Sequence, residues 1–109
     1  MERSQETTGS QIAMFHIYIE NRALADIQEA IDYYDSQQVG VGAKFLKAVE
    51  KEFVALEKNP FYAIRYKNVR CKQIKKFPYL IHFTIDETEE IIFVTAVIST
   101  HRNPDTSWL

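Results

Sequence analysis

Apolar side chains recur at helical spacing over the first half of the patterned region and alternate with polar ones over the second half. The first helical stretch carries them at Leu24, Ile27, Ile31 and Tyr34. This spacing predicts a helix that begins near Asn21, a residue type suited to capping, and ends within residues 36–42. Its exposed face is expected to be acidic, through Asp26, Glu29, Asp32 and Asp35.

A second helix is predicted directly after the first. Its apolar face consists of Phe45, Leu46, Val49, Phe53 and Leu56. Asn59 and Pro60 end it, because proline has no backbone N–H to continue the helical hydrogen bonds. The glycine-containing join between the two stretches is short, so we expect a helical hairpin.

The remaining patterned segments are strand-like. The expected strands are residues 16–20, 62–67, 69–76, 79–85 and 91–98. The last of these is almost entirely apolar, which is typical of a central strand covered on both faces, and a polar turn at residues 86–90 precedes it. The order is an N-terminal strand, a two-helix hairpin and then an antiparallel sheet, which predicts an α+β fold.

The chain is expected to form one domain. Its 109 residues suit a single core, and residues 14–109 contain all of the patterned segments. Residues 1–13 are polar and show no periodicity, so we expect them to be a disordered leader.

Composition restricts where the protein works. No apolar run approaches the ~20 residues that a membrane span needs, and no secretory signal is evident. The single cysteine, Cys71, excludes an internal disulfide framework and suits a reducing compartment such as the cytoplasm. Cys71 lies in a predicted strand and is expected to be a small buried thiol rather than a nucleophile.

Six basic residues and no acidic one lie between Arg65 and Lys76, in a chain whose net charge is −2. Such a local excess indicates a polyanionic or acidic partner. An edge strand that carries lysines to prevent aggregation is an equally good interpretation. The cluster consists of Arg65, Lys67, Arg70, Lys72, Lys75 and Lys76.

No motif predicts a metal or a cofactor. The zinc-protease, paired-cysteine and calcium-loop spacings are absent. Residues 39–44 have glycines before a lysine, as phosphate-binding loops do, but the remaining glycine pattern and the Ser/Thr after the lysine are missing. We therefore expect these residues to form the turn between the two helices.

Three motifs, taken together with the order of elements, resemble the RelE/ParE superfamily of type II toxin-antitoxin systems. The first, in the first helix, consists of Ala25-Asp26-Ile27, Glu29-Ala30 and Asp32-Tyr33-Tyr34. The second is the segment from Arg70 that ends in Lys76-Phe77-Pro78-Tyr79-Leu80-Ile81. The third is Val94-Thr95-Ala96-Val97-Ile98, followed by His101-Arg102-Asn103-Pro104 and Trp108. The resemblance extends from about Phe15 to Trp108.

The resemblance implies a toxin that a cognate antitoxin neutralises, as in plasmid stabilisation systems. RelE-like members cleave mRNA on the ribosome, whereas ParE-like members inhibit DNA gyrase. It also implies a target-binding set that consists of Arg70, Lys72, Lys75, Lys76, Arg102 and Trp108. Arg70 and His101 would be catalytic only in a nuclease, with Arg70 stabilising phosphate charge and His101 acting as acid or base.

Two departures favour a ParE-like toxin that acts by binding and inhibits growth. Many relatives have histidine where this chain has Ser99, although His101 lies two residues further on. The isoelectric point near 5.9 is low for a protein that approaches ribosomal RNA. A RelE-like endoribonuclease and a family member that binds antitoxin without toxicity remain the alternatives.

Overall fold

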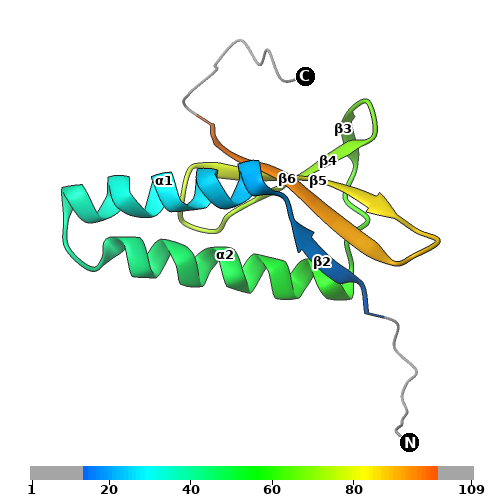
Figure 1. The fold of residues 1–109 in the computed structure, drawn as a ribbon, viewed down its shortest axis with the longest axis horizontal. Helices are drawn as coiled ribbons and strands as arrows, with labels where there is room; N and C mark the ends of the chain where they lie inside the picture. The colour runs from blue at the N-terminus through cyan, green and yellow to red at the C-terminus, as the bar shows by residue number, and fades with distance from the viewer. Residues whose placement is uncertain (1–13, 101–109) are drawn as a thin grey trace, which may run out of the picture.

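The computed structural model describes residues 14–100, which form two helices packed on one face of a five-stranded sheet (Figure 1). The elements are β2 (His16–Ile19), α1 (Asn21–Gln37), α2 (Val41–Lys58), β3 (Ile64–Tyr66), β4 (Val69–Gln73), β5 (Tyr79–Asp86) and β6 (Ile91–Ser99). The predicted α+β class and the helical hairpin are therefore confirmed. The disordered leader predicted for residues 1–13 lies outside the described residues.

The sheet is mixed rather than purely antiparallel. Its strand order is β2-β6-β5-β4-β3, and β2 runs parallel to β6 while all other neighbours are antiparallel. The helical hairpin separates β2 from the other strands along the chain, and it gives the backbone the length to return in the same direction. The β5–β6 hairpin closes through the predicted polar turn, where the N–H of Glu89 donates to the Asp86 carboxylate.

The core lies between the helices and the sheet. It includes Ile27 of α1, Phe45 and Leu56 of α2, Phe83 of β5 and Ile92 of β6. Each of these side chains is almost or fully buried. The helical spacing of the helix residues and the alternation along the strands bring these positions to one interface.

The start of α1 corrects two predictions. Glu20, not Asn21, is the N-cap residue, because the Glu20 carbonyl accepts the first helical hydrogen bond, from the Leu24 N–H. Leu24 is also half-exposed, and the buried stripe uses Ala23, Ile27 and Ala30 instead. These alanines let the helix approach the sheet closely.

Asp26 does not belong to the exposed acidic face predicted for α1. Its side chain is only 14% exposed and accepts the N–H of Val97 at 3.0 Å. The pairing between β2 and β6 ends at Val94, so Val97 lies beyond the last β2 partner. Asp26 therefore satisfies an N–H group at the edge of β6 that would otherwise cost free energy.

Three strand predictions also need correction. The segments expected at residues 62–67 and 69–76 are shorter, Ile64–Tyr66 and Val69–Gln73, because Lys67 and Lys76 have positive φ angles in turns. As predicted, β6 is an interior strand, between β2 and β5, but it is not covered on both faces along its whole length. In the first half of β6 only alternate residues are buried, since both helices lie on the same face of the sheet.

The join between the helices is closed by Asp35, as expected for a turn. Its carboxylate accepts the N–H groups of Gly40 at 3.2 Å and Gly42 at 2.8 Å. The Asp35 carboxylate thus accepts the backbone N–H groups that would otherwise be available to a phosphate at the start of α2. The resemblance of residues 39–44 to a phosphate-binding loop has no counterpart in the structure.

Replacing Gly42 by alanine is expected to destabilise the fold by about 1–3 kcal/mol. The added Cβ would lie 2.7 Å from the carbonyl oxygen of Ile31 and 2.8 Å from the Asp35 carboxyl group, so the helices would have to separate. Chemical denaturation measures the loss. Gly40→Ala is the control, because nothing lies within 4 Å of its Cβ, and only its φ of +97° opposes alanine. An unchanged stability of Gly42→Ala would refute the close approach.

Candidate partner-binding site

Arg70 lies on β4 with its guanidinium group held by the segment before β3. Its Nη1 donates to the carbonyl oxygen of Tyr62 at 2.7 Å, and its Cζ lies 5.6 Å from the centre of the Phe61 ring. A hydrogen bond and a cation–π contact together orient this side chain. Part of its donor capacity is therefore used within the protein.

Lys72 points to the same face of β4 as Arg70 and forms a largely buried ion pair. Its Nζ lies 2.6 Å from Oε1 of Glu52 on α2 and 5.2 Å from the centre of the Tyr62 ring. Burial lowers the pKa of Lys72, but its hydrogen bonds to Glu52 and Tyr62 outweigh that effect, and the net pKa is raised. Lys72 stays charged and links the sheet to the helix.

The turn between β4 and β5 brings Lys75 and Lys76 opposite α2. The backbone N–H of Lys75 donates to Oε2 of Glu52 at 3.1 Å, so one carboxylate holds both the end of β4 and the turn. Phe77 anchors the other side of the turn, with its ring centre 5.1 Å from that of Phe45. The side chains of Lys75 and Lys76 remain exposed.

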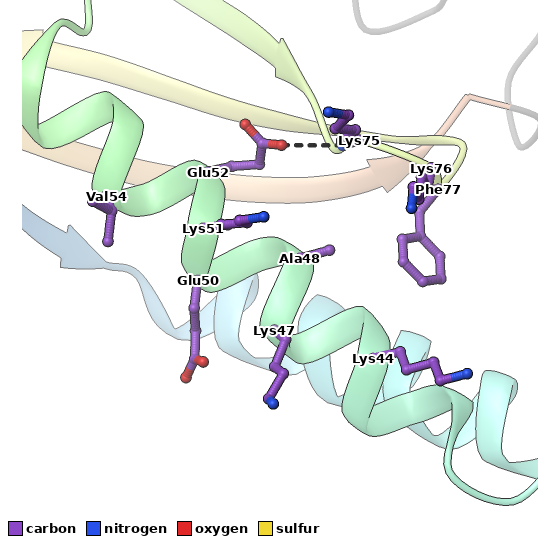
Figure 2. A pocket seen from close by; sticks show the side chains of 10 residues that line it. All are labelled: Lys44, Lys47, Ala48, Glu50, Lys51, Glu52, Val54, Lys75, Lys76 and Phe77. Carbon is purple, nitrogen blue, oxygen red and sulfur yellow. Dashed lines mark hydrogen bonds between the residues drawn. The ribbon is translucent and has the colours of Figure 1, made fainter.

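A groove of about 690 Å³ separates this turn from α2. In Figure 2, Lys76 and Phe77 point from the turn toward α2, Lys75 lies at the start of the turn beside Glu52, and Lys51 and Ala48 extend from the helix toward the turn. The groove, called here the lysine groove, is lined by Lys44, Lys47, Ala48, Glu50, Lys51, Glu52, Val54, Lys75, Lys76 and Phe77. The groove is concave, its charged side chains are mostly lysines, and its walls also contain the apolar residues Ala48, Val54 and Phe77.

Comparison with known proteins identifies the family. A family model described as the ParE toxin of the parDE type II toxin-antitoxin system matches residues 17–104, most of the chain. The chain belongs to the ParE toxin family. Membership confirms the predicted resemblance to the RelE/ParE superfamily and implies an antitoxin partner.

The fold comparison agrees with this family. A chain from the chromosomal ParDE TA system of P. aeruginosa superposes with a TM-score of 0.69 at 15% sequence identity. The match covers 80% of the present chain and 97% of that one. No curated protein sequence matches significantly. The ParE-family fold is thus retained in a divergent sequence.

The lysine groove unites only part of the site predicted for this ParE-family chain. Lys75 and Lys76 line it, whereas Arg70 and Lys72 do not. The predicted site residues His101, Arg102 and Trp108 lie outside the described residues. The sequence interpretation missed Lys44, Lys47 and Lys51, although their spacing of three and four residues places them along one stripe of α2.

A second group of polar side chains is buried on the other side of β4 and β5. The His82 side chain is fully buried, and its Nδ1 lies 3.0 Å from the Tyr66 hydroxyl and 3.5 Å from Sγ of Cys71. Burial lowers the pKa of His82 to about 4 and raises that of Cys71 to about 11. Both groups are neutral at physiological pH, and Cys71 is a buried thiol, as expected.

Within residues 14–100, no three His, Cys, Asp or Glu side chains are grouped as metal ligands would be. In the same range, neither helix is long and apolar enough to cross a bilayer.

Proposed function

We propose that this chain is the toxin of a toxin-antitoxin pair and inhibits growth by binding an essential protein, such as DNA gyrase, rather than by cutting mRNA. The family match supports the toxin role. The choice of binding over cleavage rests on the isoelectric point near 5.9, which is low for a protein that approaches ribosomal RNA, and on Ser99 where many relatives have histidine. The composition of the lysine groove supports the same choice. The protein would act in the cytoplasm, together with its target, and the toxin-antitoxin pair would stabilise a plasmid that carried it.

The lysine groove lacks the side chains that favour RNA cleavage. A ribonuclease must activate the 2′-hydroxyl and protonate the leaving oxygen, which histidine does best near neutral pH. Among the described residues that line the groove there is no histidine, tyrosine or arginine. A lining of lysines and apolar side chains is better suited to binding a protein surface than to cleaving RNA.

Among the described members of the predicted target-binding set, Lys75 and Lys76 present their side chains to a partner most openly. Both are exposed at the groove, whereas the Lys72 side chain is only 15% exposed and already paired. Arg70, on β4, does not line the groove. It would contribute to target binding through the guanidinium N–H groups that do not bond to the Tyr62 carbonyl oxygen. We therefore expect target binding to depend more on the turn than on the strand.

Inducing the protein in bacteria without its antitoxin tests the proposal. Growth arrest is expected, together with relaxed plasmid DNA, because inhibited gyrase no longer introduces negative supercoils. Co-expression of the neighbouring antitoxin gene should restore growth and supercoiling. Plasmid topology on chloroquine gels and genome-wide mapping of mRNA 5′ ends provide the two readouts.

Ile92→Asp is the control for this experiment, since a charge at this fully buried position should abolish folding without changing the gene dose. Codon-phased mRNA ends with normal supercoiling would replace the binding proposal by the ribonuclease. Unaffected growth in cells that accumulate the folded protein would indicate a non-toxic family member that retains antitoxin binding.

A further inference from the structure

The two walls of the lysine groove are held in place by contacts within the protein. The Glu52 carboxylate on α2 accepts the Lys75 N–H of the turn at 3.1 Å and pairs with the Lys72 ammonium group at 2.6 Å. The Phe77 ring adds a contact to Phe45 of α2 at 5.1 Å. A preorganised cavity loses less entropy when it binds a ligand. Its volume of about 690 Å³ lies within the range of ~300–1,000 Å³ that is typical of small-molecule sites.

The charge of the groove is opposite to that of the chain. Five lysines and two glutamates line it, a formal charge of +3, whereas the whole chain carries −2. Glu52 is already paired with Lys72, and Figure 2 shows Glu50 extending from α2 away from the turn. Lys44 and Lys51 extend from the same helix on the side of the turn. The cations of both walls therefore attract an anion to the space between them.

The cations of the groove are all lysines, and this indicates which anion they suit. No arginine is among the described residues that line the groove. Arginine binds a carboxylate through a planar fork of donors, whereas the lysine ammonium group is a compact point charge that often binds phosphate. Several point charges around one space suit a ligand that has many acceptor oxygens and a high charge in a short length. Phosphate groups joined in a chain have both properties.

The apolar part of the lining does not favour recognition of a nucleotide base. A base stacks on an exposed aromatic ring, and Phe77 supplies the one ring among the described lining residues. Phe77 is half-buried, and its ring lies 5.1 Å from the rings of both Phe45 and Tyr34. Ala48 and Val54 are aliphatic. The groove is therefore suited to the phosphates of a ligand, and an attached nucleoside would not be recognised.

We propose that the lysine groove binds a polyphosphate chain, either the triphosphate group of a nucleotide or inorganic polyphosphate. Lys44 and Lys51 donate to the phosphate oxygens from α2, and Lys75 and Lys76 donate to them from the turn. This binding site goes beyond the proposed function and does not depend on it, because it is tested on the purified protein alone.

Neutralising one lysine on each wall tests the proposal. The variant Lys51→Gln/Lys76→Gln is compared with Lys58→Gln/Lys67→Gln, which removes the same charge at exposed lysines that do not line the groove. Thermal melts first establish that both variants fold. Calorimetry then measures the binding of inorganic triphosphate, ATP, adenosine and a hexaglutamate peptide. The buffer contains no divalent cations, which would compete with the lysines for the phosphates.

Triphosphate and ATP should bind to the wild-type protein, and adenosine should not. The groove variant should bind triphosphate at least about 10-fold more weakly, because two charged hydrogen-bond donors are lost, whereas the control variant should bind it normally. Added salt should weaken the binding. Tighter binding of ATP than of triphosphate would assign a nucleotide as the ligand, and affinity that rises with the length of an inorganic chain would assign polyphosphate. Either result supports the site.

Three results would overturn the proposal. Equal affinity of the two variants for triphosphate would mean that diffuse surface charge, and not the groove, attracts the anion. Binding of hexaglutamate as tight as that of triphosphate would replace the phosphate chain by an acidic peptide. The third result is a lack of triphosphate binding by the wild-type protein.

Amide chemical shifts of the wild-type protein, titrated with triphosphate, locate the site without any variant. Changes concentrated at residues 44–51 and 75–77 support the groove, and changes confined to other residues overturn it. Growth arrest on induction remains a separate measurement, so failure of the polyphosphate site leaves the proposed toxin function intact.

Discussion

Replacing Glu52 by glutamine is expected to lower the free energy of unfolding by about 3–5 kcal/mol. The substitution keeps the shape of the side chain but leaves Lys72 charged, largely buried and without its carboxylate. It also weakens the acceptor for the Lys75 N–H, so the β4–β5 turn loses one of its attachments to α2. Urea or guanidinium denaturation at neutral pH measures the change.

Two further variants isolate the role of the ion pair. Glu50→Gln removes a carboxylate from an exposed position two residues away and should change stability by less than about 0.5 kcal/mol. Glu52→Leu/Lys72→Met removes both charges and should be more stable than Glu52→Gln, because no buried charge is left unpaired. If Glu52→Gln were as stable as Glu50→Gln, the pair would have no structural role.

Stability is expected to fall as the pH is lowered from about 7 toward 4, with a contribution of about 3 kcal/mol from His82. Burial, and to a smaller extent the positive charges of Arg22 and Arg65, lowers its pKa from 6.5 to about 4 in the folded protein. Between pH 6.5 and about 4, the His82 imidazole binds a proton more readily in the unfolded chain than in the folded protein. The stability contributed by neutral His82 is therefore present above pH 6.5 and lost as the pH falls through the folded value.

The comparison of two histidine variants isolates this effect from that of the carboxylates, which titrate in the same range. His82→Gln should flatten the dependence of unfolding free energy on pH, whereas His16→Gln, at an exposed position on β2, should retain the wild-type slope. The readout is the slope rather than the absolute stability, because glutamine also changes the contact with Tyr66. Identical slopes in all three proteins would contradict the prediction.

The sequence alone predicted which residues are buried where an element's own periodicity decides its buried face. Phe45, Val49 and Leu56 recur at helical spacing and are fully buried, as predicted, and Tyr79, Ile81 and Phe83 alternate on the core side of β5. In both cases the signal lies within a single element.

The sequence was insufficient where the role of a residue depends on a distant segment. Asp26 belongs to an acidic run in the sequence, but it is turned toward β6 by the N–H of Val97. Lys72 is one of six clustered cations, and only the packing of α2 against β4 makes it the partner of Glu52. Likewise, Lys44, Lys47 and Lys51 resemble an ordinary solvated helix face until the β4–β5 turn is placed opposite them. Local patterns do not encode such pairings.

The parallel pairing of β2 with β6 has a consequence for synthesis of the protein. His16 pairs with Ile91, so the first strand has no partner until the last one has been made. The helical hairpin ends at Lys58, and its apolar faces need strands β5 and β6 to cover them. At ~5–20 residues per second, the ribosome takes roughly 2–8 s to extend the chain from Lys58 to Ser99. During that interval the apolar faces of the two helices stay exposed, although residues 75–77, the second wall of the lysine groove, are made before β6 is complete.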